Sequence, residues 1–158
     1  MSNLRMIAIP MKVADLVRTT MKSPGYGHPA HKEIAGGYGP CRLCLRTFRV
    51  GHEERLLFTY DPFHEVAPYP LPGPVFIHAE GCTRYELHNT FPEDLRAHAL
   101  TLIGYGDNRT VLTKEYLEGG RAEEGARRLL KDPAIHYLHV RDTEAGCYDF
   151  RIERDCTG

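Results

Sequence analysis

The stretches IHYLHVR (residues 135–141) and CYDFRIE (residues 147–153) predict the two strands of a β-hairpin, and this hairpin decides the fold. The loop between them, residues 142–146, ends in a glycine and has a length that suits a hairpin connection. Side chains alternate between the two faces of a strand, so a single face carries Leu138, Val140, Tyr148, Phe150 and Ile152. That face is apolar and belongs in a hydrophobic core.

The opposite face of the predicted hairpin is rich in ionisable side chains. It carries His139, Arg141, Cys147, Asp149, Arg151 and Glu153. If the strands pair symmetrically about the loop, His139 lies opposite Asp149 and Tyr137 lies opposite Arg151. A carboxylate beside the imidazole would fix its tautomer and raise its pKa. The alternative is a solvated sheet face with ordinary cross-strand charge pairs.

The rest of the sequence predicts more strands and two main helices. Short apolar stretches predict strands at residues 4–9, 55–60, 75–78, 99–105 and 111–117. Apolar side chains at helical spacing predict helices over 11–21 and 121–131, with a short helix at 92–97. The stretch 25–40 is rich in glycine and is expected to be a loop. This order of elements favours an α+β fold with a largely antiparallel sheet, two main helices and a C-terminal β-hairpin.

Length and composition predict a single soluble domain over residues 1–158. The 20 basic and 21 acidic residues leave no basic excess, which argues against a nucleic-acid partner. No stretch has the apolar length of a secretion signal or a membrane span, so we expect a cytoplasmic protein with no membrane partner. In that compartment the odd number of cysteines, five, predicts reduced thiols and no disulfide framework.

The most conspicuous motif is Cys41-Arg42-Leu43-Cys44. Two thiolates at this spacing can bind one zinc ion or exchange a disulfide. A structural zinc site needs two more ligands, which His78 with Cys82, or His139 with Cys147, could supply only through the fold. The sequence favours the simpler interpretation, in which Cys41 and Cys44 are small buried thiols and no cofactor is bound.

The leading functional hypothesis is a ligand-binding domain or small enzyme with a cationic pocket for a small anion, such as a carboxylate or phosphate. The residues expected to bind the ligand are Arg42, His78, Arg141 and Cys147. His139 would act as acid or base and Asp149 would orient it. The sequence leaves open whether the protein is an enzyme, although it lacks the nucleophile elbow of serine hydrolases and the phosphate-binding P-loop.

Two alternatives stay open beside the pocket. One is a non-enzymatic interaction module, with a homodimer as its simplest form, that presents residues 68–74 and 25–40 as its contact surface. The other is a zinc-binding protein that uses Cys41 and Cys44 as metal ligands.

Several motifs resemble one known family when they are taken in order. They are PCRLC (40–44), LLFTY (56–60), GPVFIH (73–78), DPAIHYLHVR (132–141) and GCY (146–148). Together they are similar to the small bacterial proteins of domain-of-unknown-function family 1203, over residues 3 to 154. The resemblance implies a bacterial single-domain protein with no established activity, so it carries no catalytic residues over to this chain. The second cysteine, Cys44, is not a fixed part of the family pattern, which weakens the zinc interpretation.

Overall fold

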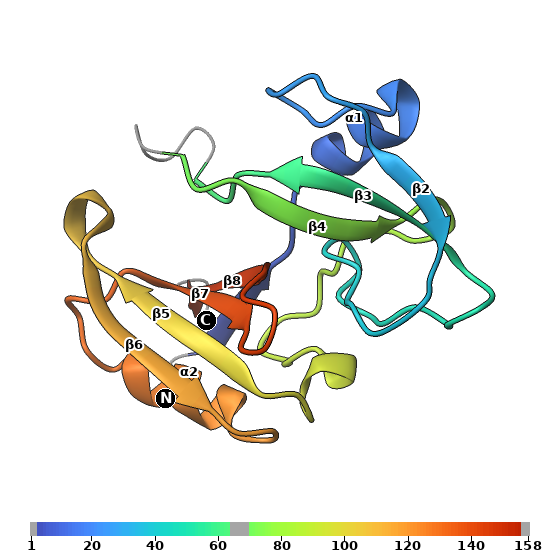
Figure 1. Ribbon diagram of the computed structural model, residues 1–158. Helices are drawn as coiled ribbons and strands as arrows, with labels where there is room; N and C mark the ends of the chain where they lie inside the picture. Colours follow the sequence, from blue (N-terminus) through green and yellow to red (C-terminus); the bar gives the residue numbers. More distant parts are fainter. Residues whose placement is uncertain (1–2, 64–69, 156–158) are drawn as a thin grey trace. The chain divides into compact units, whose positions relative to one another are not determined.

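The computed structural model describes residues 3–63 and 70–155 (Figure 1). The chain divides into two compact units, which we name by their sheets. The five-stranded unit comprises Met1–Ile7 with Glu86–Gly158, and the three-stranded unit comprises Ala8–Tyr85. The expectation of a single domain stays a prediction.

The five-stranded unit is an antiparallel sheet with one α-helix. Its strands are β1 (Asn3–Ile7), β5 (Leu100–Tyr105), β6 (Val111–Leu117), β7 (Tyr137–Asp142) and β8 (Tyr148–Asp155). They lie in the order β1-β8-β7-β5-β6, so the chain's first and last described strands are neighbours. Short 3₁₀ turns occur at Glu93–Leu95 and Asp107–Arg109.

Helix α2 (Ala122–Leu129) lies against one face of this sheet (Figure 1). It buries Ala122, Gly125, Ala126 and Leu129, while its charged side chains are half-buried or exposed, as on an amphipathic helix. The close approach depends on Gly125, because a Cβ atom there would lie 2.4 Å from Leu117 of β6. Leu102, Leu138, Val140, Phe150 and Ile152 are buried in the core of this unit.

The three-stranded unit combines helix α1 (Met11–Thr20) with strands β2 (His31–Ile34), β3 (Glu54–Tyr60) and β4 (Gly73–His78). The strands are antiparallel in the order β2-β3-β4. Helix α1 buries Ala14 and Val17, and the sheet buries Leu56, Phe58, Val75 and Ile77. The long connection between β2 and β3 contains the Cys41–Cys44 motif.

The predicted fold class is confirmed. The described part of the chain is α+β, with antiparallel sheets, two α-helices and a C-terminal β7-β8 hairpin. The expectation of a continuous loop over 25–40 was wrong, because β2 lies within it and pairs with β3. Glycines flank this short strand, and they concealed it in the sequence. Part of the proline-rich segment proposed as a contact surface, residues 68 and 69, lies outside the described residues.

The predicted register of the hairpin was also wrong. His139 pairs with Arg151 and Val140 pairs with Phe150, but Arg141 pairs with Tyr148. Asp149 is therefore an extra residue, a β-bulge, and it does not lie opposite His139. Because the bulge shifts the strand by one position, Tyr148 lies on the face of His139 and not on the core face.

Within the ranges 3–63 and 70–155, neither α-helix has the length and apolar character that crossing a membrane requires.

Gly119, which precedes α2, offers a test of how closely the chain packs in the five-stranded unit. A Cβ atom at Gly119 would lie 2.2 Å from the backbone oxygen of Ala97, and a backbone atom cannot move aside as a side chain can. We expect Gly119→Ala to lower the free energy of unfolding by about 1–3 kcal/mol, measured by urea titration. Gly36→Ala is the control, because a Cβ atom there meets no atom within 4 Å. Equal stability of the two variants would contradict this packing.

Candidate metal centre

The sequence Cys41-Arg42-Leu43-Cys44-Leu45 forms a tight turn, which we call the knuckle. The backbone N–H of Leu45 donates to the carbonyl of Cys41 at 2.8 Å, and the N–H of Cys41 donates to the carbonyl of Arg46 at 2.9 Å. Leu45 adopts a φ of 59°, which costs about 1 kcal/mol or more for a residue other than glycine. Its side chain is buried, and this burial offsets the cost. The turn directs both cysteine side chains to the same side.

Strand β4 carries the next ligand candidate to the knuckle. Cys41 forms a parallel bridge with Phe76, and the N–H of Arg42 donates to the carbonyl of Phe76 at 2.9 Å. Gly39 permits this approach, since a Cβ atom there would lie 3.1 Å from the Phe76 ring. His78 follows Phe76 by two residues and so lies on the same face of the strand. The bend after β4, with Gly81 at a φ of +85°, returns the chain so that Cys82 joins the group.

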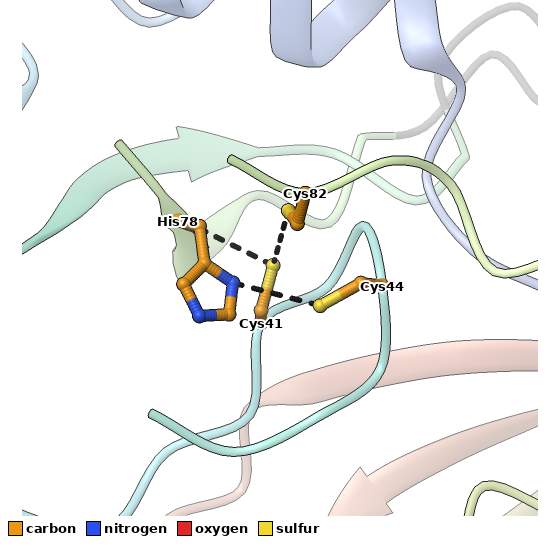
Figure 2. Close-up of side chains that lie close together, drawn as sticks. All are labelled: Cys41, Cys44, His78 and Cys82. Atoms are coloured by element: carbon orange, nitrogen blue, oxygen red, sulfur yellow. Dashed lines mark hydrogen bonds between the residues drawn. The ribbon is translucent and has the colours of Figure 1, made fainter. Parts of the chain in front are cut away.

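Figure 2 shows the result, in which the side chains of Cys41, Cys44, His78 and Cys82 point toward one another. Their ligand atoms all lie within 4.8 Å of one another. The Sγ atoms of Cys41 and Cys82 are 3.8 Å apart, and Nδ1 of His78 is 3.5 Å from Sγ of Cys44. These three sulfurs and one nitrogen could hold a metal ion.

Each sulfur in this cluster also receives a hydrogen bond from a nitrogen donor. The N–H of His78 donates to Sγ of Cys41 at 3.3 Å, and the N–H of Cys44 donates to the same sulfur. The N–H of Arg46 donates to Sγ of Cys44. The guanidinium of Arg18, on α1, donates to Sγ of Cys82 at 3.3 Å. Such donors stabilise negative charge on sulfur, which a metal-bound thiolate carries.

The His78 ring is oriented by two neighbours outside the cluster. Its Nε2 lies 3.3 Å from a carboxylate oxygen of Glu53, and its ring centroid lies 4.4 Å from that of Phe48. A carboxylate accepts only, so Nε2 carries the proton and donates to Glu53. When Nδ1 is unprotonated, as metal binding requires, its lone pair faces the sulfurs. This carboxylate–imidazole pair is a common support for a metal-binding histidine.

The pKa values in the cluster are shifted because its thiols and imidazole are buried and hydrogen-bonded to one another. Burial opposes ionisation of Cys41, but hydrogen bonds from Cys44, Cys82 and His78 outweigh it and hold the pKa of Cys41 well below its usual range. Hydrogen bonds to Cys41 and Cys82 raise the pKa of Cys44. Burial disfavours the charged form of His78, but the thiols of Cys41 and Cys82 raise its pKa to about 10. Without a metal, the cluster therefore holds a thiolate beside an imidazolium.

The sequence analysis identified part of this centre. Cys41 and Cys44 are both buried, as the interpretation as small buried thiols expected, and they also belong to a cluster. Of the two completing pairs that were considered, the structure brings His78 and Cys82 to the knuckle. Glu53 was missed, because no local pattern in the sequence links it to the cysteines.

Arg18 was also missed as a neighbour of the cluster. It is far from the motif in the sequence, and no local pattern could have linked it to the cysteines. Arg42 lies in the knuckle, buried, where its Nη1 donates to the carbonyl of Pro40 at 2.8 Å.

The hairpin candidates form a separate group in the five-stranded unit. His139 is buried among the rings of Tyr105, Tyr137 and Tyr148, with centroids 5.0–5.3 Å away. Burial, and then the charges of nearby arginines including Arg141, lower its pKa well below the usual value. The expectation that Asp149 would raise this pKa was therefore wrong, because His139 lies opposite Arg151 and Asp149 is the bulge residue.

The loop end of the hairpin carries two more candidates. Arg141 donates from Nη1 to the carbonyl of Gly146 at 3.0 Å, and Cys147 is half-buried beside it. A hollow of about 500 Å³ in the five-stranded unit is lined by other residues, among them Phe91, Arg96 and Glu123. Of the residues predicted to form a cationic pocket, Arg42 and His78 belong to the three-stranded unit, and Arg141 and Cys147 belong to the five-stranded unit. The pocket stays a prediction.

Comparisons with known proteins agree with the expected family. The family described as "Protein of unknown function (DUF1203)" matches residues 38–154, which is most of the chain. No curated protein and no solved structure matches the chain.

The buried state of His139 predicts a pH dependence of stability. Its folded pKa lies below its ordinary value of 6.5, so the unfolded state binds the extra proton first as the pH falls. The stability present above pH 6.5 should decline below it, by about 1.4 kcal/mol per pH unit until the folded pKa is reached. Urea titrations over a pH series would measure this slope.

His139→Gln should flatten this slope, because glutamine does not titrate. The control is His136→Gln, since His136 is 47% exposed and should leave the slope in place. An unchanged slope in His139→Gln would show that another group causes the acid sensitivity.

Proposed function

We propose that this chain, which belongs to the DUF1203 family of proteins of unknown function, binds one zinc ion through Cys41, Cys44, His78 and Cys82. The ion would have a structural role in the three-stranded unit. The observation that carries the proposal is the close grouping of these four ligand atoms, within 4.8 Å of one another.

Two distances within the cluster match the edges of a tetrahedral zinc site. With Zn–S bonds of ~2.3 Å and a Zn–N bond of ~2.0 Å, a tetrahedron has edges of about 3.8 Å between two sulfurs and about 3.5 Å between sulfur and nitrogen. The corresponding distances are 3.8 Å between Cys41 and Cys82 and 3.5 Å between Cys44 and His78. Three thiolates and one imidazole are also a ligand set typical of structural zinc.

The surroundings support a structural role over a catalytic one. A catalytic zinc site keeps one position open for water or substrate, whereas this cluster supplies four protein ligands. Cys41, Cys44 and His78 are 0%, 9% and 7% exposed. The ion would connect the knuckle to the end of β4 and to the bend that follows it. It would thereby close a long loop in a small unit, where such a cross-link adds most stability.

Elemental analysis of protein purified without added metal is the direct test. We expect about one zinc per chain, as a closed four-ligand site implies. Cys41→Ser should reduce the zinc content to a small fraction, because one strong ligand is lost. Cys147→Ser is the matched control, since Cys147 lies in the five-stranded unit, outside the cluster. Zinc far below one per chain in the unaltered protein would contradict the proposal.

Removal of the metal should destabilise the three-stranded unit. A ligand present at about 1,000 times its Kd stabilises the folded state by about 4 kcal/mol, and chelation withdraws this contribution. We expect a strong chelator to lower the melting temperature of the unaltered protein and to leave that of Cys41→Ser unchanged. Restoring zinc should restore the melting temperature. Equal chelator effects on both proteins would show that the ion does not act through Cys41.

Glu53 should support metal binding without touching the ion. Glu53→Ala removes the acceptor for Nε2 of His78, and loss of such a partner lowers metal affinity about 10-fold to 100-fold. Competition against a chromophoric chelator measures this change. Glu54→Ala is the control, because Glu54 is the next residue and pairs instead with the exposed Lys32. Equal affinities of the two variants would remove Glu53 from the proposal.

A further inference from the structure

We infer that Cys82 is the exchangeable ligand of this centre and that Arg18 is the positioning residue that keeps it on the metal. The inference rests on the proposed zinc site. It predicts that the centre opens at one identified sulfur, while the other three ligands stay in place.

The first observation is the unequal burial of the four ligands. Cys41, Cys44 and His78 are buried, whereas Cys82 is only half-buried. A ligand that solvent reaches can be displaced by water or attacked by a reagent, while a fully buried one is protected. Cys82 is therefore the sulfur at which exchange begins.

The second observation is how rigidly the backbone holds the other ligands. The knuckle is held by bonds from the N–H of Ile9 to Arg42 O at 3.2 Å and from the N–H of Tyr85 to Leu43 O at 2.8 Å. It is also bonded to β4 through Arg42 and Phe76. His78 is the last residue of β4 and pairs with Arg55 of β3. Moving the backbone of any of these three ligands away from the centre would require breaking these backbone bonds.

Cys82 lies instead after the bend formed by Ala79, Glu80 and Gly81. A Cβ atom at Gly81 would meet no atom within 4 Å, so the bend is loosely surrounded. The donor that reaches the Cys82 sulfur from outside the cluster is a long side chain, the guanidinium of Arg18. The position of this ligand therefore depends on a long side chain from another element.

Arg18 contacts two of the four ligands, His78 and Cys82, at the same time. Its Nε and Nη2 donate to the carbonyl of His78 at 3.2 and 2.9 Å, and its Nη1 lies 3.5 Å from the carbonyl of Cys82. Its Nη2 also donates to Sγ of Cys82 at 3.3 Å. One guanidinium thus spans the bend from end to end. Its charge also suits the site, because three thiolates on a divalent ion leave a net negative charge.

The experiment is residue-resolved alkylation of the zinc-loaded full chain. Protein of verified zinc content is treated with N-ethylmaleimide, quenched over time and digested, and the label on each cysteine is measured by mass spectrometry. Zinc release is followed in parallel with a chromophoric chelator. In the unaltered protein we expect Cys82 to be labelled first, with Cys41 and Cys44 protected until zinc leaves.

Arg18→Ala should accelerate both the labelling of Cys82 and the release of zinc by about tenfold or more, because hydrogen bonds to a charged group are lost. Cys41 and Cys44 should still lag behind Cys82. Arg18→Lys keeps the charge but not the fork of donors, so its rates should lie between the two. Lys22→Ala removes an exposed cation just after α1 and should behave like the unaltered protein.

The pattern of labelling separates the possible outcomes. Equal labelling rates at the three cysteines would indicate opening by general unfolding and would overturn the inference, as would an Arg18→Ala protein that matches the unaltered one. First labelling of Cys41 or Cys44 would overturn it too. If the unaltered protein holds no zinc, the proposed function itself fails, and this result is seen before any labelling.

Discussion

The pairing of the knuckle with strand β4 is the contact on which the candidate centre depends. The bond from the N–H of Arg42 to the carbonyl of Phe76 places Cys41 beside the strand, two residues before it ends at His78. Without this pairing, the Cys41–Cys44 motif would be a pair of thiols on a long connection. With it, the alternation of side chains along β4 determines which residue faces the sulfurs. Backbone geometry, and not side-chain affinity, therefore assembles the first three ligands.

Assembling these groups has an electrostatic cost that a metal ion would remove. Buried thiols and an imidazole within hydrogen-bond distance share protons, which is why the pKa values of Cys41 and His78 are shifted in opposite directions. A buried charged pair of this kind stabilises a fold weakly, because desolvation offsets much of the attraction. A divalent ion replaces the shared protons with strong bonds to all four groups. The same donors that hold a thiolate in place without metal would then hold a zinc thiolate.

The elements of the fold could be predicted from the sequence because local patterns encode them. The alternation in 135–141 and 147–153 predicted the hairpin, and helical spacing predicted both helices to within a few residues. The register could not be predicted, because Arg141 already pairs with Tyr148 beside the loop, and the bulge at Asp149 shifts every later pair by one more residue. Neither shift leaves a local signal in the sequence. The strand β2 was concealed because its four residues are too few to show a period and glycines lie on both sides of it.

The candidate metal centre, like the fold, could be predicted from the sequence only in part. The spacing of Cys41 and Cys44 is visible in the sequence, but the choice between the pair His78 with Cys82 and the pair His139 with Cys147 depends on which strand lies beside the knuckle. The supporting residues Arg18 and Glu53 are still harder to predict from the sequence, since they belong to segments with no motif of their own.

The two units also differ in what stabilises them. The five-stranded unit buries an apolar sheet face against α2, and even its histidine, His139, is enclosed by aromatic rings. The three-stranded unit is Ala8–Tyr85, a length at which a hydrophobic core alone rarely supplies more than about 3–5 kcal/mol. A metal cross-link adds stability to a unit of this size. Its four clustered ligand atoms are the groups through which the proposed metal would cross-link this unit.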